Sequence, residues 1–267
     1  MPQKEKIRKM FDDISGDYDR LNHLMSMGID KTWRRRAMRA IFSGIQPVDK
    51  TAPMSRPAVV PRAGSASNAG ENAPLKILDV ACGTGDFSID MARYAKRHGE
   101  AVNPGVKIDG LDLSSGMLAV MDRKVKAAGL GDVISKQVGD CLDMPFPDAS
   151  FDRVTIAFGI RNFEDREGAL VEIRRVLKPK GKLVILELSV PSAKVIRSIY
   201  NLYFLHFLPW IGGMISGDKA AYQYLPASVL AFPPKDKFMA TLRSCGYKDV
   251  RHKAFTFGIC RMYVAEN

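Results

Sequence analysis

The sequence predicts an α/β fold in which helices cover both faces of a mainly parallel sheet. Short apolar segments alternate with amphipathic ones from residue 75 to residue 188, and this alternation is typical of parallel strands joined by helices. A glycine-rich turn follows the first apolar segment, as at the carboxyl end of a strand that leads into a helix. Two strand-like runs, 249–257 and 259–265, close the chain. Joined at Gly258, they should add an antiparallel hairpin and complete a sheet of seven strands.

Each core element is predicted from apolar periodicity and from the residues at its ends. Strands are expected at residues 77–80, 106–113, 133–138, 151–158 and 182–188, and helices near residues 86–97, 116–128, 167–177 and 235–245. Leu170, Ile173 and Leu177 recur at helical spacing, so the third helix has one apolar face. Gly246 follows the last helix, where glycine commonly ends a helix.

The segments before the core differ from it in composition. Residues 1–45 have the pattern of amphipathic helices broken near Gly16 and Gly28. Residues 47–74 are rich in Pro, Ala, Ser, Gly and Asn and lack apolar periodicity. We therefore expect a helical N-terminal segment followed by a flexible insertion.

The chain is strongly basic, with a formal net charge of +11 and a pI near 9.5. Basic residues cluster at 4–9 and at 31–39, which includes the run W-R-R-R at 33–36. A solvated helix face is the ordinary explanation of such a run, and nucleic acid or an anionic membrane surface are the alternatives. Nucleic acid has little support, because no zinc-ligand spacing, recognition helix or RNA-binding aromatic motif accompanies the run.

The cysteines indicate a reducing compartment. Cys82, Cys141, Cys245 and Cys260 form no C-x-x-C pair, and the N-terminus has no apolar signal core, so we expect a cytoplasmic protein. Cys82 lies inside the glycine turn, where filling of a tight turn by a small side chain is favoured over a nucleophilic role.

The glycine turn predicts a cofactor site. It has the sequence L-K-I-L-D-V-A-C-G-T-G-D-F-S at residues 75–88, in which Gly83 and Gly85 remove the Cβ atoms that would keep a ligand off the backbone. Backbone N–H groups at the helix start should then be free to meet a polar ligand. A dinucleotide-binding turn would need glycine at Ser88, and a Walker loop would need a lysine. With Asp79 just before the turn, we expect a cofactor without a pyrophosphate, such as S-adenosylmethionine.

Two further acids follow the next two strands. Asp112 ends the second strand, where its carboxylate could accept both ribose hydroxyls, and Asp140 follows the third strand, at a height suited to an adenine amino group. Each could instead be a helix N-cap, and for Asp112 alone both interpretations stay open. Three acids at successive strand ends favour a ligand site, because ligands bind at the carboxyl ends of parallel strands.

Residues 195–215 are long and apolar enough to raise the question of a membrane span. Arg197, Asn201, His206 and Pro209 interrupt the segment, and a central arginine costs about 2.5–3.5 kcal/mol on insertion. We expect instead a helix that covers the cofactor cleft, with its aromatic face lining an apolar substrate pocket or resting on a bilayer. An ordinary core helix is the alternative.

Motifs spread along the chain resemble one enzyme family. They lie at residues 11–34, 78–88, 144–152, 158–163 (F-G-I-R-N-F), 175–183, 206–212 and 222–225. With them the chain resembles the ubiquinone/menaquinone biosynthesis C-methyltransferases, most closely the demethylmenaquinone methyltransferases. This resemblance implies a class I Rossmann-like methyltransferase fold with S-adenosylmethionine as cofactor and no metal. It also implies that Thr84, Asp112, Asp140 and Cys141 contact the cofactor, whereas Ala157 stands where relatives often carry serine, and so lacks that hydroxyl.

The expected chemistry assigns further residues. Transfer of a methyl group to a ring carbon needs an electron-rich quinol, a base and a group that holds the phenolate. Arg161 and Asn162 follow the fourth strand and could hold the oxygen, and arginine, with a pKa above about 12, suits a clamp better than a base. The proton path is assigned to residues that could equally be structural: Tyr18, Asp19, His206 and Tyr222.

The predicted activity is methylation of a prenylated demethylquinol, with demethylmenaquinol favoured over a benzoquinol precursor of ubiquinone. A basic nucleic-acid-binding protein on the same fold is the alternative from another class. We expect one domain, divided into a helical cap (1–46), an insertion (47–74), a cofactor-binding core (75–190), a substrate lid (191–234) and a C-terminal helix and hairpin (235–267). The basic face and the lid should contact the inner face of an anionic membrane peripherally; the oligomeric state is left open.

Overall fold

The structure is a computed structural model that describes residues 3–16, 18–44, 73–98, 105–202 and 219–267. Its seven-stranded sheet has the order β3-β2-β1-β4-β5-β7-β6. Strands β1 to β5 are parallel to their neighbours, and β7 runs antiparallel to both β5 and β6. The predicted sheet, mainly parallel with an antiparallel C-terminal hairpin, is therefore confirmed.

The elements agree with the expected ranges to within a few residues. The strands are β1 (Leu75–Val80), β2 (Val106–Asp112), β3 (Ile134–Val138), β4 (Phe151–Ala157), β5 (Leu177–Leu188), β6 (Lys248–Phe255) and β7 (Cys260–Glu266). The helices are α1 (Gln3–Ile14), α2 (Tyr18–Met25), α3 (Ile29–Ile41), α4 (Asp86–Arg97), α5 (Ser115–Ala127), α6 (Arg166–Val176), α7 (Lys194–Leu202), α9 (Lys219–Ala231) and α10 (Lys235–Ser244), with short 3₁₀ turns η1 (Ile160–Asn162) and η3 (Thr256–Gly258).

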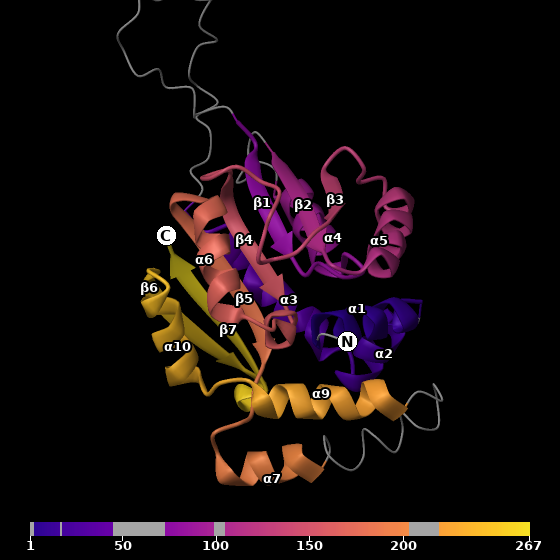
Figure 1. Cartoon of the computed structure of the whole chain (residues 1–267), viewed down its shortest axis with the longest axis vertical. Helices are drawn as coiled ribbons and strands as arrows, with labels where there is room; N and C mark the ends of the chain where they lie inside the picture. Colours follow the sequence, from indigo (N-terminus) through magenta and orange to yellow (C-terminus); the bar gives the residue numbers. More distant parts are fainter. Residues whose placement is uncertain (1–2, 17, 45–72, 99–104, 203–218) are drawn as a thin grey trace, which may run out of the picture.

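The sheet separates two apolar cores, because alternate residues of its strands point to opposite faces. Ile77 of β1 packs in the core beneath α3, α4 and α5, and Leu78 packs in the core beneath α6 and α10. Figure 1 shows these helices on the two faces of the sheet. The core therefore fixes the strand ends from both sides.

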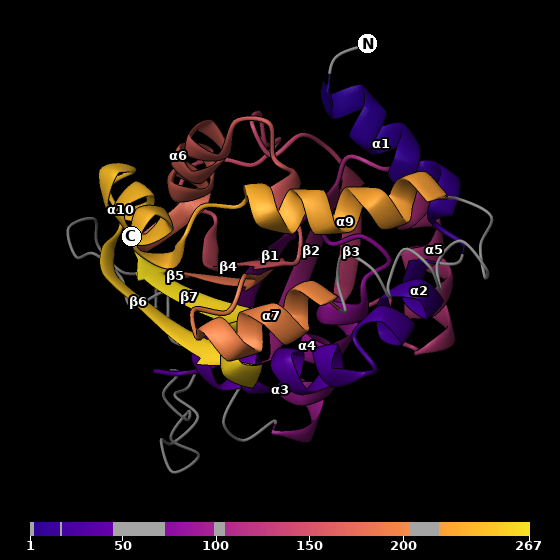
Figure 2. The same ribbon diagram turned by 90° about the horizontal axis from the view of Figure 1, so that it is seen from below.

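A third group of helices lies beyond the carboxyl ends of the parallel strands. Figure 1 places α1, α2, α9 and α7 there, and Figure 2 shows this end of the molecule from below. Helix α7 contains the start of the apolar segment expected to form a lid, whereas residues 203–218 lie outside the described residues. In the described ranges no helix is long and apolar enough to cross a membrane. Most of the expected insertion also lies outside the described part of the chain.

A buried carboxyl group links the glycine turn to the sheet. The Asp79 side chain accepts hydrogen bonds from Ser88 Oγ at 2.6 Å and from Thr155 Oγ1 at 2.7 Å. Burial raises the pKa of Asp79 to about 6, and the two hydroxyl donors only partly oppose this effect. Asp79 therefore joins β1, β4 and the first turn of α4.

We predict that Asp79 makes the protein less stable as the pH rises from about 4 to 6. The folded state binds this proton more tightly than the unfolded state, in which the Asp79 carboxyl has a pKa near its ordinary value. The contribution of Asp79 to the free energy of unfolding should therefore be about 3 kcal/mol lower at neutral pH than at low pH. In Asp79→Asn this contribution should be absent, which urea unfolding at pH 4, 5, 6 and 7 can measure. Asp132→Asn, a change at an exposed aspartate, should keep the wild-type pH dependence. Equal pH dependence of the wild type and Asp79→Asn would contradict the prediction.

Candidate active site

Two cavities meet at the carboxyl ends of the parallel strands. The first has a volume of about 130 Å³ and lies between α1 and the ends of β1, β2 and β3. The second has a volume of about 470 Å³ and is bounded by α2, α3, α7 and η3. Five residues line both cavities: Tyr18, Ala81, Gly83, Ala157 and Phe158. The two cavities therefore adjoin along this shared wall.

Asp112 lies in the first cavity, as its position at the end of β2 predicted. Its two carboxylate oxygens accept hydrogen bonds from the backbone N–H groups of Gly83 and Ser114, each at 2.8 Å. A carboxylate can accept about four hydrogen bonds, so two positions are left for ligand hydroxyls. Burial raises the pKa of Asp112, and the backbone donors oppose that rise.

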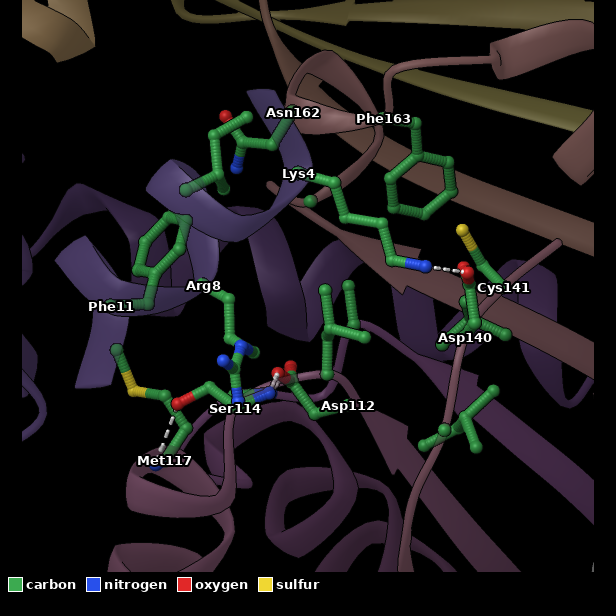
Figure 3. Close-up of a pocket in the computed structure, with 18 of the residues that line it drawn as sticks. Lys4, Arg8, Phe11, Asp112, Ser114, Met117, Asp140, Cys141, Asn162 and Phe163 are labelled. Atoms are coloured by element: carbon green, nitrogen blue, oxygen red, sulfur yellow. Dashed lines mark hydrogen bonds and ion pairs between the residues drawn. The ribbon is translucent and has the colours of Figure 1, made fainter. Parts of the chain in front are cut away.

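Asp140 and Cys141 lie together in the same cavity (Figure 3). Asp140 forms an ion pair with Lys4 and accepts a hydrogen bond from the Leu142 N–H at 3.1 Å. Although burial acts in the opposite sense, the Lys4 ammonium lowers the pKa of Asp140. Burial, together with Asp140, raises the pKa of Cys141 to about 12, so this thiol stays protonated at neutral pH.

Helix α1 supplies a wall of the first cavity that sequence reasoning did not assign. Figure 3 shows Lys4, Arg8 and Phe11 of this helix around the cavity. Asp12 fastens the helix to the start of α5, because its carboxylate accepts from Ser114 Oγ at 2.5 Å and from the Gly116 N–H at 3.0 Å. The amphipathic pattern of α1 predicted a helix but not the surface on which it packs.

The glycine turn has the predicted shape, but the N–H groups of its two glycines form hydrogen bonds within the protein. Gly83 and Gly85 have φ angles of +55° and +81°, which favour glycine. The Gly83 N–H binds Asp112, and the Gly85 N–H donates to the Cys82 carbonyl at 3.0 Å. The N–H groups of these two glycines are therefore not available to a ligand, whereas the expectation for the N–H groups at the start of α4 stays a prediction. The glycine N–H groups shape the turn instead, which suits a cofactor that needs no phosphate cradle.

Thr84 and Asp19 lie together at the turn. The Thr84 hydroxyl donates to Asp19, which also accepts from Lys124 Nζ at 2.6 Å. Lys124 pairs in addition with Asp86 at the start of α4. Asp19, which was assigned to the proton path, thus joins α2 to the glycine turn.

Arg34, from the basic run, is buried and not part of a solvated face. Its guanidinium pairs with Asp30 at 2.5 Å, Asp90 at 2.7 Å and Asp86 at 3.2 Å. Burial would lower the pKa of Arg34, but these three carboxylates raise it overall. His23 lies beside them, with Nδ1 3.1 Å from Asp30 and Nε2 3.5 Å from Asp86.

Arg161 lines the second cavity from η1, next to a buried acid that sequence reasoning missed. It binds Glu187 Oε1 at 3.0 Å and Ser228 Oγ at 3.2 Å, and its N–H donates to Glu187 Oε2 at 3.1 Å. Despite burial, Glu187 raises the pKa of Arg161, so the guanidinium stays charged. The sequence feature that could have identified Glu187 is an acidic residue at the end of the apolar run that forms β5.

Asn162 and Tyr18 face the shared wall. Asn162 lines the first cavity and accepts a hydrogen bond from the Tyr224 hydroxyl at 3.0 Å. Burial raises the pKa of Tyr18, and the nearby Arg161 charge acts in the opposite direction, so Tyr18 keeps its proton at neutral pH. His206 lies outside the described residues, as does the side chain of Tyr222. Their assignments stay predictions.

The first cavity fits the adenosine part of S-adenosylmethionine. Asp112 keeps acceptor capacity at the end of β2, Asp140 offers a second acceptor, and a Cβ atom at Gly83 would meet no protein atom within 4 Å. In the parts of the chain that the structure describes, no group of three His, Cys, Asp or Glu side chains is placed to hold a metal ion.

Comparison with known proteins gives one family. The family model described as "ubiE/COQ5 methyltransferase family" matches residues 1–51 and 60–267. The chain is 42% identical to a ubiquinone/menaquinone biosynthesis C-methyltransferase of Geobacter sulfurreducens over 98% of this chain and 88% of that protein. It is 39% identical to a demethylmenaquinone methyltransferase of Thermus thermophilus over 96% of this chain and 99% of that protein.

Solved structures share the fold at low identity. One is a SAM-dependent methyltransferase from Aquifex aeolicus, with a TM-score of 0.51 and 18% identity over 72% of this chain and 81% of that chain. The [4+2]-cyclase SpnF has a TM-score of 0.54 and 18% identity over 73% of this chain and 76% of that chain. Since the second is named for a different reaction, the fold alone does not specify the chemistry.

We predict that Asp112→Asn weakens binding of S-adenosylhomocysteine by about 10- to 100-fold. The change removes a charged acceptor for the ribose hydroxyls, and such hydrogen bonds contribute about 1.5–3 kcal/mol. Isothermal titration calorimetry measures the effect, with thermal unfolding as a check on folding. Asp143→Asn, an exposed aspartate on the neighbouring loop, should bind like the wild type. Equal affinities for Asp112→Asn and wild type would exclude the ribose assignment.

Proposed function

The chain belongs to the ubiE/COQ5 methyltransferase family, and we propose that it methylates a ring carbon of a prenylated demethylquinol, with demethylmenaquinol as the preferred substrate. The observation that carries the proposal is the shared wall: one cavity suits the cofactor, and the larger one opens beside it around Arg161. The names of relatives support both menaquinone and ubiquinone pathways. Demethylmenaquinol is favoured because the names of both relatives include menaquinone.

S-adenosylmethionine is the cofactor of this family, and when bound it supplies an electrophilic methyl group. Asp112, Asp140 and Gly83 would hold it in the first cavity. The shared wall then restricts where a substrate ring can lie, and holding two reactants in reacting geometry supplies much of the rate enhancement.

The second cavity suits an apolar ring that develops negative charge on oxygen. Most of its lining is apolar, including Trp33, Phe158 and Ile259. The Arg161 guanidinium provides a fixed positive charge, and Glu187 holds it in place at 3.0 Å. A charge that is already oriented in a water-poor site stabilises a developing phenolate more than one in water. Arg161 is therefore assigned to the quinol oxygen, with Asn162 and Tyr18 at the edge of the same wall.

The nucleic-acid-binding alternative is weakened, because one of the three arginines on which it depends is buried. It required Arg34, Arg35 and Arg36 to form a cationic surface, but Arg34 is buried among three aspartates. Arg35 and Arg36 are exposed, which leaves them free to meet an anionic membrane surface instead.

A cytoplasmic location with peripheral membrane contact completes the proposal. All four cysteines are free thiols, as is usual in a reducing compartment. A substrate with a prenyl tail resides in the bilayer, so the enzyme must reach the membrane surface to meet it.

We predict that the purified protein methylates reduced, short-tailed demethylmenaquinol in the presence of S-adenosylmethionine. The oxidised quinone should give no product, because it lacks the hydroxyl that makes the ring carbon electron-rich. Product mass measures the reaction, and a demethylated benzoquinol run in parallel tests the ring. If only the benzoquinol is methylated, the substrate is the benzoquinol. If no quinol is methylated, the proposed function is wrong.

We predict that Arg161→Lys lowers kcat by about 10²- to 10³-fold, because lysine cannot reproduce the orientation fixed by Glu187. Binding of S-adenosylhomocysteine should not change, since Arg161 lines only the second cavity. Arg153→Lys is the matched control: Arg153 is also buried, but its Nε donates to the Ile41 carbonyl, away from both cavities. A similar loss of kcat in Arg153→Lys, or none in Arg161→Lys, would contradict the assignment.

A further inference from the structure

Large apolar side chains are exposed around the second cavity. Met27 and Phe257 line this cavity and yet have exposed fractions of 70% and 77%. Val195 and Leu202 of α7 have exposed fractions of 71% and 67%. Exposed apolar residues that occur singly are normal on protein surfaces, but a group of them around one cavity marks an interaction site. We call these four residues the apolar rim.

Helix α7 is apolar on two sides. Its inner side carries Ile196 and Tyr200, which line the second cavity. Val195 and Leu202 are seven residues apart, which places them on one helix face, and both are exposed. The cavity accounts for the inner side, whereas Val195 and Leu202 on the outer side are largely exposed. Figure 1 shows α7 beyond α9, at the end of the molecule farthest from the sheet.

Phe257 is held in an exposed position by a rigid turn. Thr256 and Phe257 have φ angles of +46° and +56°, in a region that costs energy for residues other than glycine. The turn is anchored at both ends, because Trp33 Nε1 donates to Thr256 Oγ1 at 2.8 Å and Ser189 Oγ donates to the Gly258 carbonyl at 2.5 Å. The strained backbone therefore presents a phenyl ring to the surroundings.

The exposed charges on α7 and just after Met27 are positive. Helix α7 has the sequence K-V-I-R-S-I-Y-N-L, which contains no acidic residue, and its Lys194 and Arg197 are exposed. Lys31, four residues after Met27, is also exposed. Exposed apolar side chains surrounded by cations match the interfacial region of an anionic bilayer.

We propose that the apolar rim inserts into the headgroup region of an anionic bilayer, so that the prenyl tail of the substrate passes from the lipid directly into the second cavity. This inference rests on the proposed function, because it takes the substrate to be a lipid-dissolved quinol. It assigns membrane contact to Met27, Val195, Leu202 and Phe257. The sequence predicted contact through the basic N-terminal face and the lid at 191–234; α7 lies within that lid, and the proposal adds Met27 and Phe257.

The test compares the full-length wild type with a double variant, Val195→Ser with Leu202→Ser. Both side chains point away from the cavity, so the fold and the site should be retained. Sedimentation with vesicles of equal parts phosphatidylglycerol and phosphatidylcholine should show roughly tenfold weaker partitioning of the double variant. Val171→Ser, an exposed valine on α6, is the matched control and should bind like the wild type. High salt should weaken wild-type binding, because it screens the cations.

Turnover separates docking from catalysis. With short-tailed quinol in detergent, the double variant should match the wild type, whereas with long-tailed quinol in vesicles its rate should fall with its partitioning. Wild-type-like vesicle binding by the double variant, or an equal loss in Val171→Ser, would overturn the proposal. So would a wild-type dimer that the double variant dissociates, since a second copy would then cover the rim. If no quinol is methylated in detergent, the proposed function fails, and the vesicle data still decide the docking.

Discussion

The ion pairs of Arg34 hold helix α3 against α4, the helix that follows the glycine turn. This guanidinium in α3 joins Asp30 of its own helix to Asp86 and Asp90 of α4, and removal of Asp30, its buried partner, should cost about 3–5 kcal/mol. Lys124 extends the cluster to Asp19, so α2 is fixed at the glycine turn as well. These ion pairs position the helices that bound the second cavity.

The fixed helices explain why the two cavities differ in character yet meet. The first cavity is built from strand ends, where carboxylates such as Asp112 collect. The second is bounded largely by helices, and its charged lining residues include Arg161, which is paired with the buried Glu187. In the proposed function, the cofactor lies in the first cavity and the substrate ring in the second. Tyr18 touches both of them, at the position where a methyl group would have to pass.

The features that could be predicted from the sequence depend on residues that are close together in the chain. The strand–turn–helix pattern placed Asp112 and Asp140 at one edge, because a strand end and the next helix are neighbours in the chain. The pairs of Lys4 with Asp140 and of Arg161 with Glu187 join distant segments, and neither periodicity nor spacing encodes them. Helix α9 was not predicted, since Pro226 interrupts its helical pattern. The buried Arg34 was hidden in a run that looks solvent-exposed.

A crystal structure of the protein with S-adenosylhomocysteine and a demethylmenaquinol analogue tests the central claim most directly. We expect the adenosine in the first cavity, the ring in the second with an oxygen beside Arg161, and the sulfur at the shared wall near Tyr18. The acceptor carbon should then lie within methyl-transfer reach of the sulfur, in line with the missing methyl group. A ring bound outside the second cavity, or a sulfur directed away from the shared wall, would contradict the account.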